Sequence, residues 1–190
     1  MNSFALPIGG HKRVALMGGS FDPAHKGHVL VAQNAICALR LDYVVWLVAQ
    51  QNPLKQKRPA SMEKRLRQAK ALATHPKIKV IGDPHIYAID TCRAWIAHYP
   101  QCHFVWLMGT DNWCQFHRWR GWHDMMHQIP IAIYPRPHTI LASMNSVAAQ
   151  RFANYRVPPD EMAQLSISNK SPAWALLTGK TSALASQGLR

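Results

Sequence analysis

The sequence predicts an α/β fold with a doubly wound, mostly parallel sheet and helices on both of its faces. Short apolar runs rich in β-branched residues alternate with helical stretches, an order typical of βαβ units with right-handed crossovers. The runs at 43–48 and 103–108 are almost continuously apolar, which indicates strands buried on both faces. The chain has 190 residues, 48% of them apolar, which suits one domain with a substantial core. We expect this domain at 13–190, after a loose tail at 1–12.

The first predicted βα unit carries the most informative stretch of the chain. A strand at 14–17 leads into a glycine turn, and an apolar-periodic helix follows at about 26–40. Glycines allow an anion to approach the backbone closely, and the N–H groups at a helix start attract it. The candidate phosphate-binding residues of this turn are Gly18, Gly19 and Ser20.

Two histidines, His25 and His28, stand at the start of the predicted helix. A spacing of three places them on one helix face, where both rings could donate N–H groups to the same phosphate. The alternative is a zinc site, but zinc requires a third protein ligand, and no cysteine or carboxylate lies nearby at ligand spacing. We therefore expect His25 and His28 to be the catalytic residues, and we predict no protein ligand to a metal.

The next elements continue the alternation. A basic loop follows the strand at 43–48 and leads to a helix that Ser61 begins and that stops before Pro76. Lys64 stands where a complete capping box would have Glu, so Ser61 is expected to cap the helix alone. A short strand at 78–81 precedes a helix that the chain enters over residues 87–91 and that continues to about residue 98.

The second half of the chain begins with the strand at 103–108. Gly109 and Asp111 follow it directly, at the edge where open parallel sheets bind ligands. Asp111 could accept hydrogen bonds from ribose hydroxyls there. The remaining expected elements are a strand at 129–134, a helix at about 144–155, a polar connection at 157–172 and a strand at 174–177.

Charge and composition narrow the class of protein. Twenty-two Lys and Arg against nine Asp and Glu give a net charge of +13, which suits nucleotides and other polyanions. The basic residues are spread along the chain, so we expect no nucleic-acid partner. No apolar window suits a membrane span, and residues 1–12 lack the apolar core of a signal peptide. Four cysteines without a C-x-x-C pair indicate free thiols in a reducing cytoplasm.

The stretch 18–28 reads Gly-Gly-Ser-Phe-Asp-Pro-Ala-His-Lys-Gly-His and resembles the signature of the nucleotidyltransferases, in particular that of the nicotinate-nucleotide adenylyltransferases. The resemblance implies a Rossmann-like nucleotidyltransferase fold and adenylyl transfer from ATP to nicotinate mononucleotide in NAD biosynthesis, with Mg²⁺ bound to the ATP. Pantetheine-phosphate adenylyltransferases share the turn. Phosphopantetheine and nicotinamide mononucleotide are therefore alternative acceptors, and a degenerate nucleotide-binding homologue with little turnover is a further alternative. A basic RNA-binding protein is a remote one.

Other motifs extend this resemblance to more of the site. The piece Asn-Pro-Leu-Lys at 52–55 is similar to a family loop whose lysine faces the triphosphate, which implies this role for Lys55. The pieces at 109–112 and 116–119 are similar to the family's Gly-x-Asp-Asn and Phe-His-x-Trp blocks. They imply that Gly109 and Asp111 hold the adenosine ribose and that an aromatic ring stacks on the nicotinate. The residues implied to bind the mononucleotide are Phe21, Ala88, Trp119 and Arg120.

The chain departs from the family pattern at two places. Ala88 stands where the family has Thr, so a hydroxyl contact is lost and a backbone N–H contact could remain. The last motif keeps Ser186 and Arg190 of a phosphate-binding loop, but Ala185 and Gln187 replace residues with hydroxyls. The resemblance therefore implies a weakened ATP-phosphate contact at this end of the chain. Whether the protein is a monomer or a homo-oligomer stays open.

Overall fold

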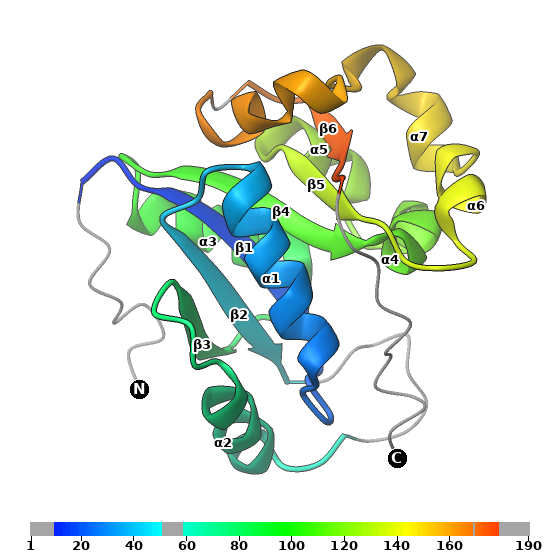
Figure 1. Cartoon of the computed structure of the whole chain (residues 1–190). Coiled ribbons are helices and arrows are strands. Elements are labelled where there is room, and N and C mark those ends of the chain that lie inside the picture. Colours follow the sequence, from blue (N-terminus) through cyan, green and yellow to red (C-terminus); the bar gives the residue numbers. More distant parts are fainter. Residues whose placement is uncertain (1–9, 51–58, 169, 179–190) are drawn as a thin grey trace.

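The computed structural model describes residues 10–50, 59–168 and 170–178. The strands form one sheet, and every neighbouring pair is parallel, in the order β3-β2-β1-β4-β5-β6 (Figure 1). The predicted doubly wound parallel fold is confirmed. The strands are β1 (Arg13–Gly19), β2 (Tyr43–Ala49), β3 (Ile78–Asp83), β4 (His103–Gly109), β5 (Ile131–Tyr134) and β6 (Trp174–Leu176).

Helices follow most of the strands and cover both faces of the sheet (Figure 1). The α-helices are α1 (Lys26–Ala38), α2 (Met62–Leu72), α3 (Ala88–His98), α4 (Thr110–Gln115), α5 (Trp122–Gln128), α6 (Ile140–Met144) and α7 (Val147–Arg151). The 3₁₀ helices are η1 (Phe116–Arg118), η2 (Ala153–Tyr155) and η3 (Pro159–Ser166).

The core has two layers, one on each face of the sheet, because successive side chains of a strand point to opposite faces. In β1, Val14 and Leu16 join the apolar cluster that includes Trp95 of α3. Ala15 and Met17 join the cluster on the other face, which α1 and α2 also enter. Both faces are therefore buried, which explains why the central strands lack polar alternation.

The expected helix at 144–155 is wrong in its extent. The structure has two short helices here, α6 and α7, followed by the 3₁₀ helix η2. The break has a local cause, since the Ser146 side chain accepts a hydrogen bond from the backbone N–H of Ala149 at 3.2 Å and so begins a new helix. Serine's capping preference thus outweighs the helical composition around it.

The expected polar connection at 157–172 is also wrong in part, because it contains the 3₁₀ helix η3. Met162 and Leu165 of η3 are buried in the same apolar cluster as α1. A 3₁₀ helix repeats every three residues and not every 3.6, so its apolar positions do not follow the α-helical period. The segment therefore covers part of the sheet as well as linking α7 to β6.

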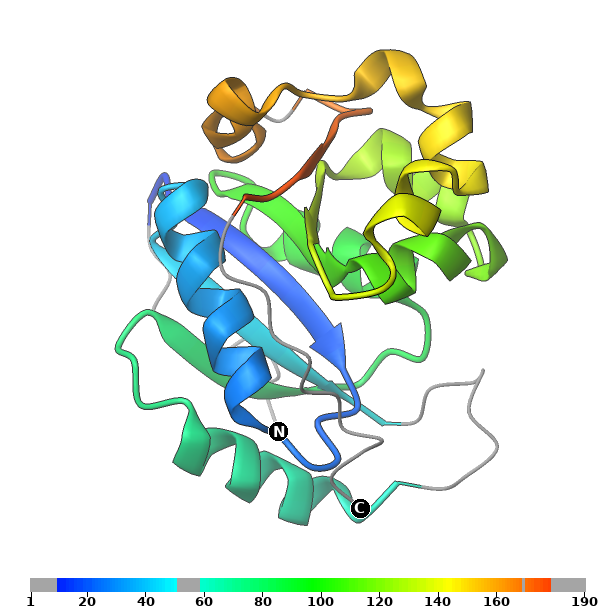
Figure 2. The ribbon, with the colours of Figure 1, turned by 45° about the vertical axis from the view of Figure 1, so that its right-hand side comes forward.

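The strand order reverses between β1 and β4, which lie side by side although many residues separate them. Figure 2 shows α1 lying across β1 and β2, with its first turn next to the carboxyl end of β1. Helices α3 and α4 also begin at the carboxyl ends of their strands. Ligands of open α/β sheets bind at this edge, next to the point where the order reverses.

Three other expectations concern membranes, thiols and the tail. Within the described residues, no helix combines the length and apolarity that a membrane crossing needs. All four cysteines are free. Residues 1–9 of the expected tail lie outside the described residues, whereas the Lys12 carbonyl accepts a 2.8 Å hydrogen bond from the N–H of His103.

Candidate active site

Two histidines form a capping box at the start of α1. His25 is the N-cap residue, with extended backbone, and its Nδ1 accepts a 3.1 Å hydrogen bond from the N–H of Gly27. The Nδ1 of His28, three residues on, accepts the N–H of His25 at 3.1 Å. In a usual capping box, Ser or Thr and Glu or Gln hold these positions. Here two imidazoles do so, and the ring centroids of His25 and His28 lie 3.9 Å apart.

These hydrogen bonds fix the proton positions on both rings. Because each Nδ1 accepts a backbone N–H, each neutral imidazole carries its proton on Nε2. The His25 side chain is 6% exposed, and its Nε2 is buried without a hydrogen-bond partner in the part of the chain that the structure describes. A buried donor without an acceptor is costly, so the site is arranged to receive an acceptor atom at this point.

The histidines are held neutral. Burial lowers the pKa of His28 from 6.5 to about 3, and the neighbouring His25 and Arg136 contribute to this shift. The pKa of His25 is lowered first by burial and then by the charge of Arg136. Both rings therefore act as hydrogen-bond donors near neutral pH and do not supply positive charge.

The histidine pair lies on an aromatic support. The ring of Phe21 stacks on Trp46 of β2 with centroids 5.1 Å apart and contacts His28 at 4.8 Å. Phe21 has a positive φ of 46° and is 1% exposed, so its ring is not open to a ligand. Contact between Phe21 and a mononucleotide would use the backbone. A Cβ on Gly19 would lie 3.1 Å from the Phe21 ring, which keeps this position small.

Two other predicted glycines lie at close approaches. A Cβ on Gly18, in β1, would stand 3.0 Å from the ring of Trp106 in β4. A Cβ on Gly109 would collide with Asp111 Oδ1 and Arg136 Nε. Gly18 thus lets the end of β1 lie against the Trp106 side chain, and Gly109 leaves room for the side chains of Asp111 and Arg136.

Asp111 and Arg136 form an ion pair at this edge, with 3.1 Å between Nε and Oδ1. The backbone N–H of Arg136 also donates to Thr110 Oγ1 at 2.9 Å, which ties the end of β5 to the start of α4. Arg136 is close enough to lower the pKa of both histidines. It was not among the predicted site residues, although its place directly after a strand in a Pro-Arg-Pro sequence was a signal.

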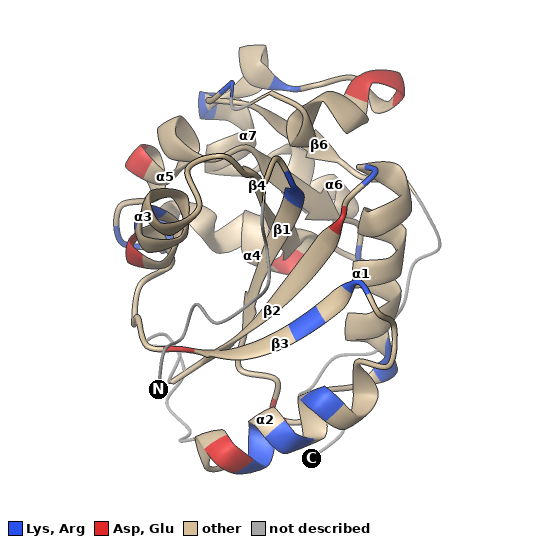
Figure 3. Ribbon diagram, turned by 90° about the vertical axis from the view of Figure 1, so that its left-hand side faces the viewer, with Lys and Arg blue, Asp and Glu red and all other residues tan. Residues whose placement is uncertain are grey.

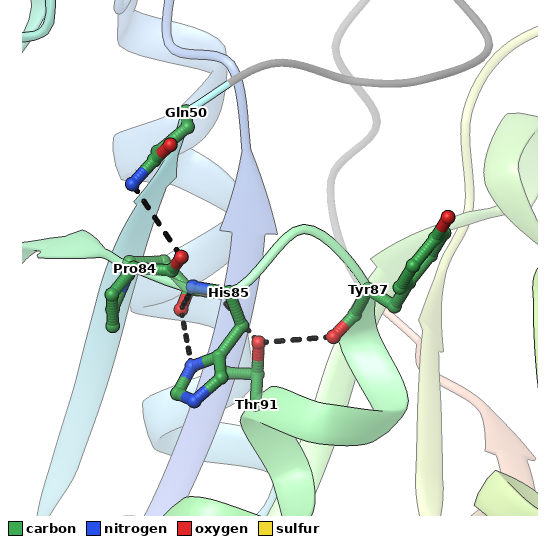
Figure 4. Close-up of polar contacts among 6 residues, drawn as sticks. Gln50, Pro84, His85, Tyr87 and Thr91 are labelled. Carbon is green, nitrogen blue, oxygen red and sulfur yellow. Dashed lines mark hydrogen bonds and ion pairs between the residues drawn. The ribbon is translucent and has the colours of Figure 1, made fainter.

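The connection from β3 to α3 is held by a buried carboxylate. Asp83 accepts hydrogen bonds from Thr91 Oγ1 at 2.7 Å and from the N–H of His85 at 3.0 Å, and His85 Nδ1 also lies 3.0 Å from it. Figure 4 shows His85 and Thr91 of this connection, and beside them Gln50 donates to the Pro84 carbonyl at 3.4 Å. The contacts fix where α3 begins, directly after Tyr87.

The first turn of α3 and the segment after η1 meet. Tyr87 is the N-cap residue of α3, and its side chain makes no capping hydrogen bond. The backbone N–H groups of the first turn, which begins at Ala88, therefore receive no hydrogen bond from the N-cap side chain. The guanidinium carbon of Arg120 lies 4.7 Å from the Tyr87 ring centroid, a cation–π contact. The structure thus brings Arg120 close to the start of α3. Arg120 and Ala88, both predicted to bind the mononucleotide, therefore lie in the same part of the site.

Trp119 is partly exposed, and other aromatic rings orient it. Its ring meets Trp106 edge to face with centroids 6.4 Å apart, and it meets Phe116 in the same manner at 5.5 Å. Trp106 also lies against Gly18, so it connects the glycine turn with Trp119. The predicted phosphate end and the predicted nicotinate end are therefore joined through one buried indole.

Three predicted residues, Lys55, Ser186 and Arg190, lie outside the described residues. Among the described residues, no group of three or more His, Cys, Asp or Glu side chains could hold a metal ion. The parallel sheet and the donor-rich turn at its switch point are features of the α/β proteins that bind nucleotides and other phosphates.

Comparisons with known proteins agree with this class. The cytidylyltransferase-like family model matches residues 16–167. Among solved structures, Plasmodium falciparum nicotinic acid mononucleotide adenylyltransferase complexed with NaAD has a TM-score of 0.66 over 94% of this chain and 82% of its own, at 16% identity. A complex of the same protein with APC has a TM-score of 0.64, also at 16% identity. At such identity the likeness shows the fold.

Relatives closer in sequence narrow the family. A protein of Methylorubrum extorquens is 43% identical over 94% of this chain and 98% of its own. One of a Caulobacter species is 41% identical over 94% and 96%. Both are named probable nicotinate-nucleotide adenylyltransferase. The chain therefore belongs to the cytidylyltransferase-like family and, within it, to the nicotinate-nucleotide adenylyltransferases.

Proposed function

We propose that the protein transfers the adenylyl group of ATP to nicotinate mononucleotide, giving nicotinate adenine dinucleotide and pyrophosphate. The observation that carries this proposal is the pair of neutral, buried imidazoles at the start of α1, with the Nε2 donor of His25 unpartnered among the described residues. The names of the relatives supply the acceptor. The enzyme is accordingly a nucleotidyltransferase of NAD biosynthesis.

The reaction needs positioned donors more than it needs a base. An oxygen of the mononucleotide phosphate attacks the α-phosphorus of ATP, and the bond from that phosphorus to the bridging oxygen of pyrophosphate breaks. The attacking phosphate is already an anion near neutral pH, so no side chain has to remove a proton. Catalysis then comes from in-line positioning and from donors that stabilise the charge on the phosphoryl oxygens.

The two histidines are the donors in this scheme. The Nε2–H groups of His25 and His28 bind the α-phosphate oxygens and the leaving pyrophosphate, and the backbone N–H groups of Gly19 and Ser20 add to them. Because the pKa of His28 lies near 3, its ring meets the incoming phosphates as a neutral donor near neutral pH. Arg136 contributes the positive charge that the rings lack, since it lies close enough to lower their pKa.

Other predicted residues divide between the two substrates. Gly109 and Asp111 bind the adenosine ribose of ATP, while Lys55, Ser186 and Arg190 bind its phosphates. Trp119 stacks on the nicotinate ring, and the backbone at Ala88 and the Arg120 side chain face its carboxylate. The last assignment is supported by the 4.7 Å contact that keeps Arg120 above Tyr87, next to the start of α3.

Mg²⁺ accompanies ATP in this proposal and neutralises the charge on its phosphates. The side chains fit an ion held mainly by phosphate and water, because the histidine Nδ1 atoms accept backbone N–H groups and Asp111 pairs with Arg136. We further propose a cytoplasmic enzyme, in keeping with its four free thiols.

The test is a panel of acceptors with ATP and Mg²⁺, in which pyrophosphate release is measured. Nicotinate mononucleotide should be the best substrate, ahead of nicotinamide mononucleotide and phosphopantetheine. His28→Ala, which removes one preorganised donor, should lower kcat by a factor of about 10² and serves as the control against contaminating activity. A folded wild-type protein that releases no pyrophosphate with any acceptor contradicts the proposal.

A further inference from the structure

Arg65 of α2 is an arginine buried in the interior, 2% exposed. Helix α2 has four basic residues, and Figure 3 shows Lys and Arg along much of its length. Lys64, Arg67 and Lys70 are exposed, as expected for a solvated helix face. Arg65 differs from them because its guanidinium points into the protein, where an unpaired charge would be costly.

The Arg65 guanidinium binds four backbone carbonyls. Its Nε donates to Ala60 at 2.8 Å, and one terminal nitrogen donates to Ser20 at 2.8 Å and to Ala49 at 2.6 Å. The other terminal nitrogen donates to Gln50 at 3.1 Å. Four of its five N–H donors are thus used on three segments: the turn after β1, the end of β2 and the start of α2.

The bond to Ser20 sets the direction of a peptide in the phosphate turn. The Ser20–Phe21 peptide is trans, so its carbonyl and its N–H point in opposite directions. With the Ser20 carbonyl held by Arg65, the N–H of Phe21 must point away from α2. Phe21 also has φ of 46°, a conformation that costs energy in a residue with a Cβ and needs support from its surroundings.

A second tie joins the same segments. The N–H of Ala60 donates to Asp22 Oδ2 at 3.2 Å, so the turn after β1 is bound to the start of α2 at both Ser20 and Asp22. Asp22 and Ser20 flank Phe21, whose ring supports His28. The conformation of the glycine turn therefore depends on a side chain from a helix outside the turn.

We propose that Arg65 is a positioning residue, which holds the Ser20–Phe21 peptide so that the turn presents its N–H groups and the histidine pair to the substrate phosphates. This role rests on the proposed function, since it takes ATP as the ligand of the turn. Arg65 itself contacts backbone oxygens and no reacting atom.

The test compares Arg65→Met and Arg65→Lys with Arg67→Met, a control at an exposed position of the same helix. Arg65→Met should lower kcat by a factor of about 10², because a small displacement of catalytic groups reduces the rate by about that factor. The KM of the mononucleotide should change less than about threefold, since Trp119 and α3 belong to other elements. Arg65→Lys, which keeps the charge and one donor group, should recover part of kcat, and Arg67→Met should equal the wild type.

Folded Arg65 variants with wild-type kcat and wild-type ATP affinity would overturn the proposal, even if they melt at a lower temperature. If neither variant folds, the wild-type protein decides, by the NMR resonances of the terminal guanidinium N–H groups of Arg65, one of which binds Ser20: ATP must shift them, and unshifted resonances refute the role. Calorimetric ATP affinity separates this proposal from the enzyme assignment. A wild-type protein that binds ATP without turnover contradicts the proposed function. The role of Arg65 is then tested by the ATP affinity of its variants.

Discussion

The buried neutral state of His28 should make the protein sensitive to acid. In the unfolded chain, His28 binds a proton below its ordinary pKa of 6.5, whereas in the native state it does so only near pH 3. Between these values the unfolded state holds more protons, so the free energy of unfolding falls as the pH falls. The stability that the neutral His28 contributes is fully present above pH 6.5 and is lost as the pH falls towards 3.

The size of this effect follows from the two pKa values. At pH 5, His28 is mostly protonated in the unfolded state but not in the native state, where its pKa is about 3. This difference lowers the free energy of unfolding by about 2 kcal/mol relative to pH 8. Replacing His28 with glutamine removes this titration and keeps the capping geometry, because glutamine at this position accepts the N–H of the N-cap residue in an ordinary capping box. Between pH 8 and pH 5, the free energy of unfolding of His28→Gln should therefore fall by about 2 kcal/mol less than that of the wild type.

Urea unfolding of both proteins at the two pH values measures this difference. All other titrating groups are common to both chains, so their contributions cancel in the comparison to first order. Equal losses of stability in the wild type and in His28→Gln would refute the conclusion that His28 is neutral in the folded protein.

The remaining predictions concern the substrate ends and the β3–α3 connection. Trp119→Ala should raise the mononucleotide KM about tenfold, the value of one lost aromatic stack, and should leave the KM of ATP nearly unchanged; equal effects on both would mean that Trp119 only packs. Gly109→Ala should raise the KM of ATP about tenfold, because the new methyl group displaces the Asp111–Arg136 pair, and an unchanged KM would contradict this. Thr91→Val should lower the free energy of unfolding by about 1–3 kcal/mol in urea titrations, since Asp83 loses its 2.7 Å donor, whereas Thr91→Ser should retain most of it.

Local patterns explain what was predictable from the sequence. The strands β1, β2 and β4 are runs of apolar residues buried on both faces, and such runs are visible without knowledge of their neighbours. The histidine pair was also visible, because His25 and His28 are close in the chain and their roles depend on one helix start. The sequence did not show that their Nδ1 atoms cap the helix, which depends on ring orientation.

Residues that act over long sequence distances were missed. Arg136 reaches the site from the end of β5, and Arg65 reaches it from a helix whose other basic residues are exposed. An arginine that binds backbone carbonyls leaves no pattern in the sequence, because a carbonyl is present at every residue. The η3 segment was missed for a different reason, since its few apolar residues follow neither the period of an α-helix nor that of a strand.

The neighbouring positions of β1 and β4 have a consequence for how the protein is made. The glycine turn and the histidines leave the ribosome early, but Asp111 and Arg136 are synthesised 83 to 118 residues after them. The proposed phosphate site is therefore complete only when the second half of the chain pairs with β1, a contact of long sequence separation that forms slowly. A nascent chain that ends before β4 contains the whole signature motif and has no complete site.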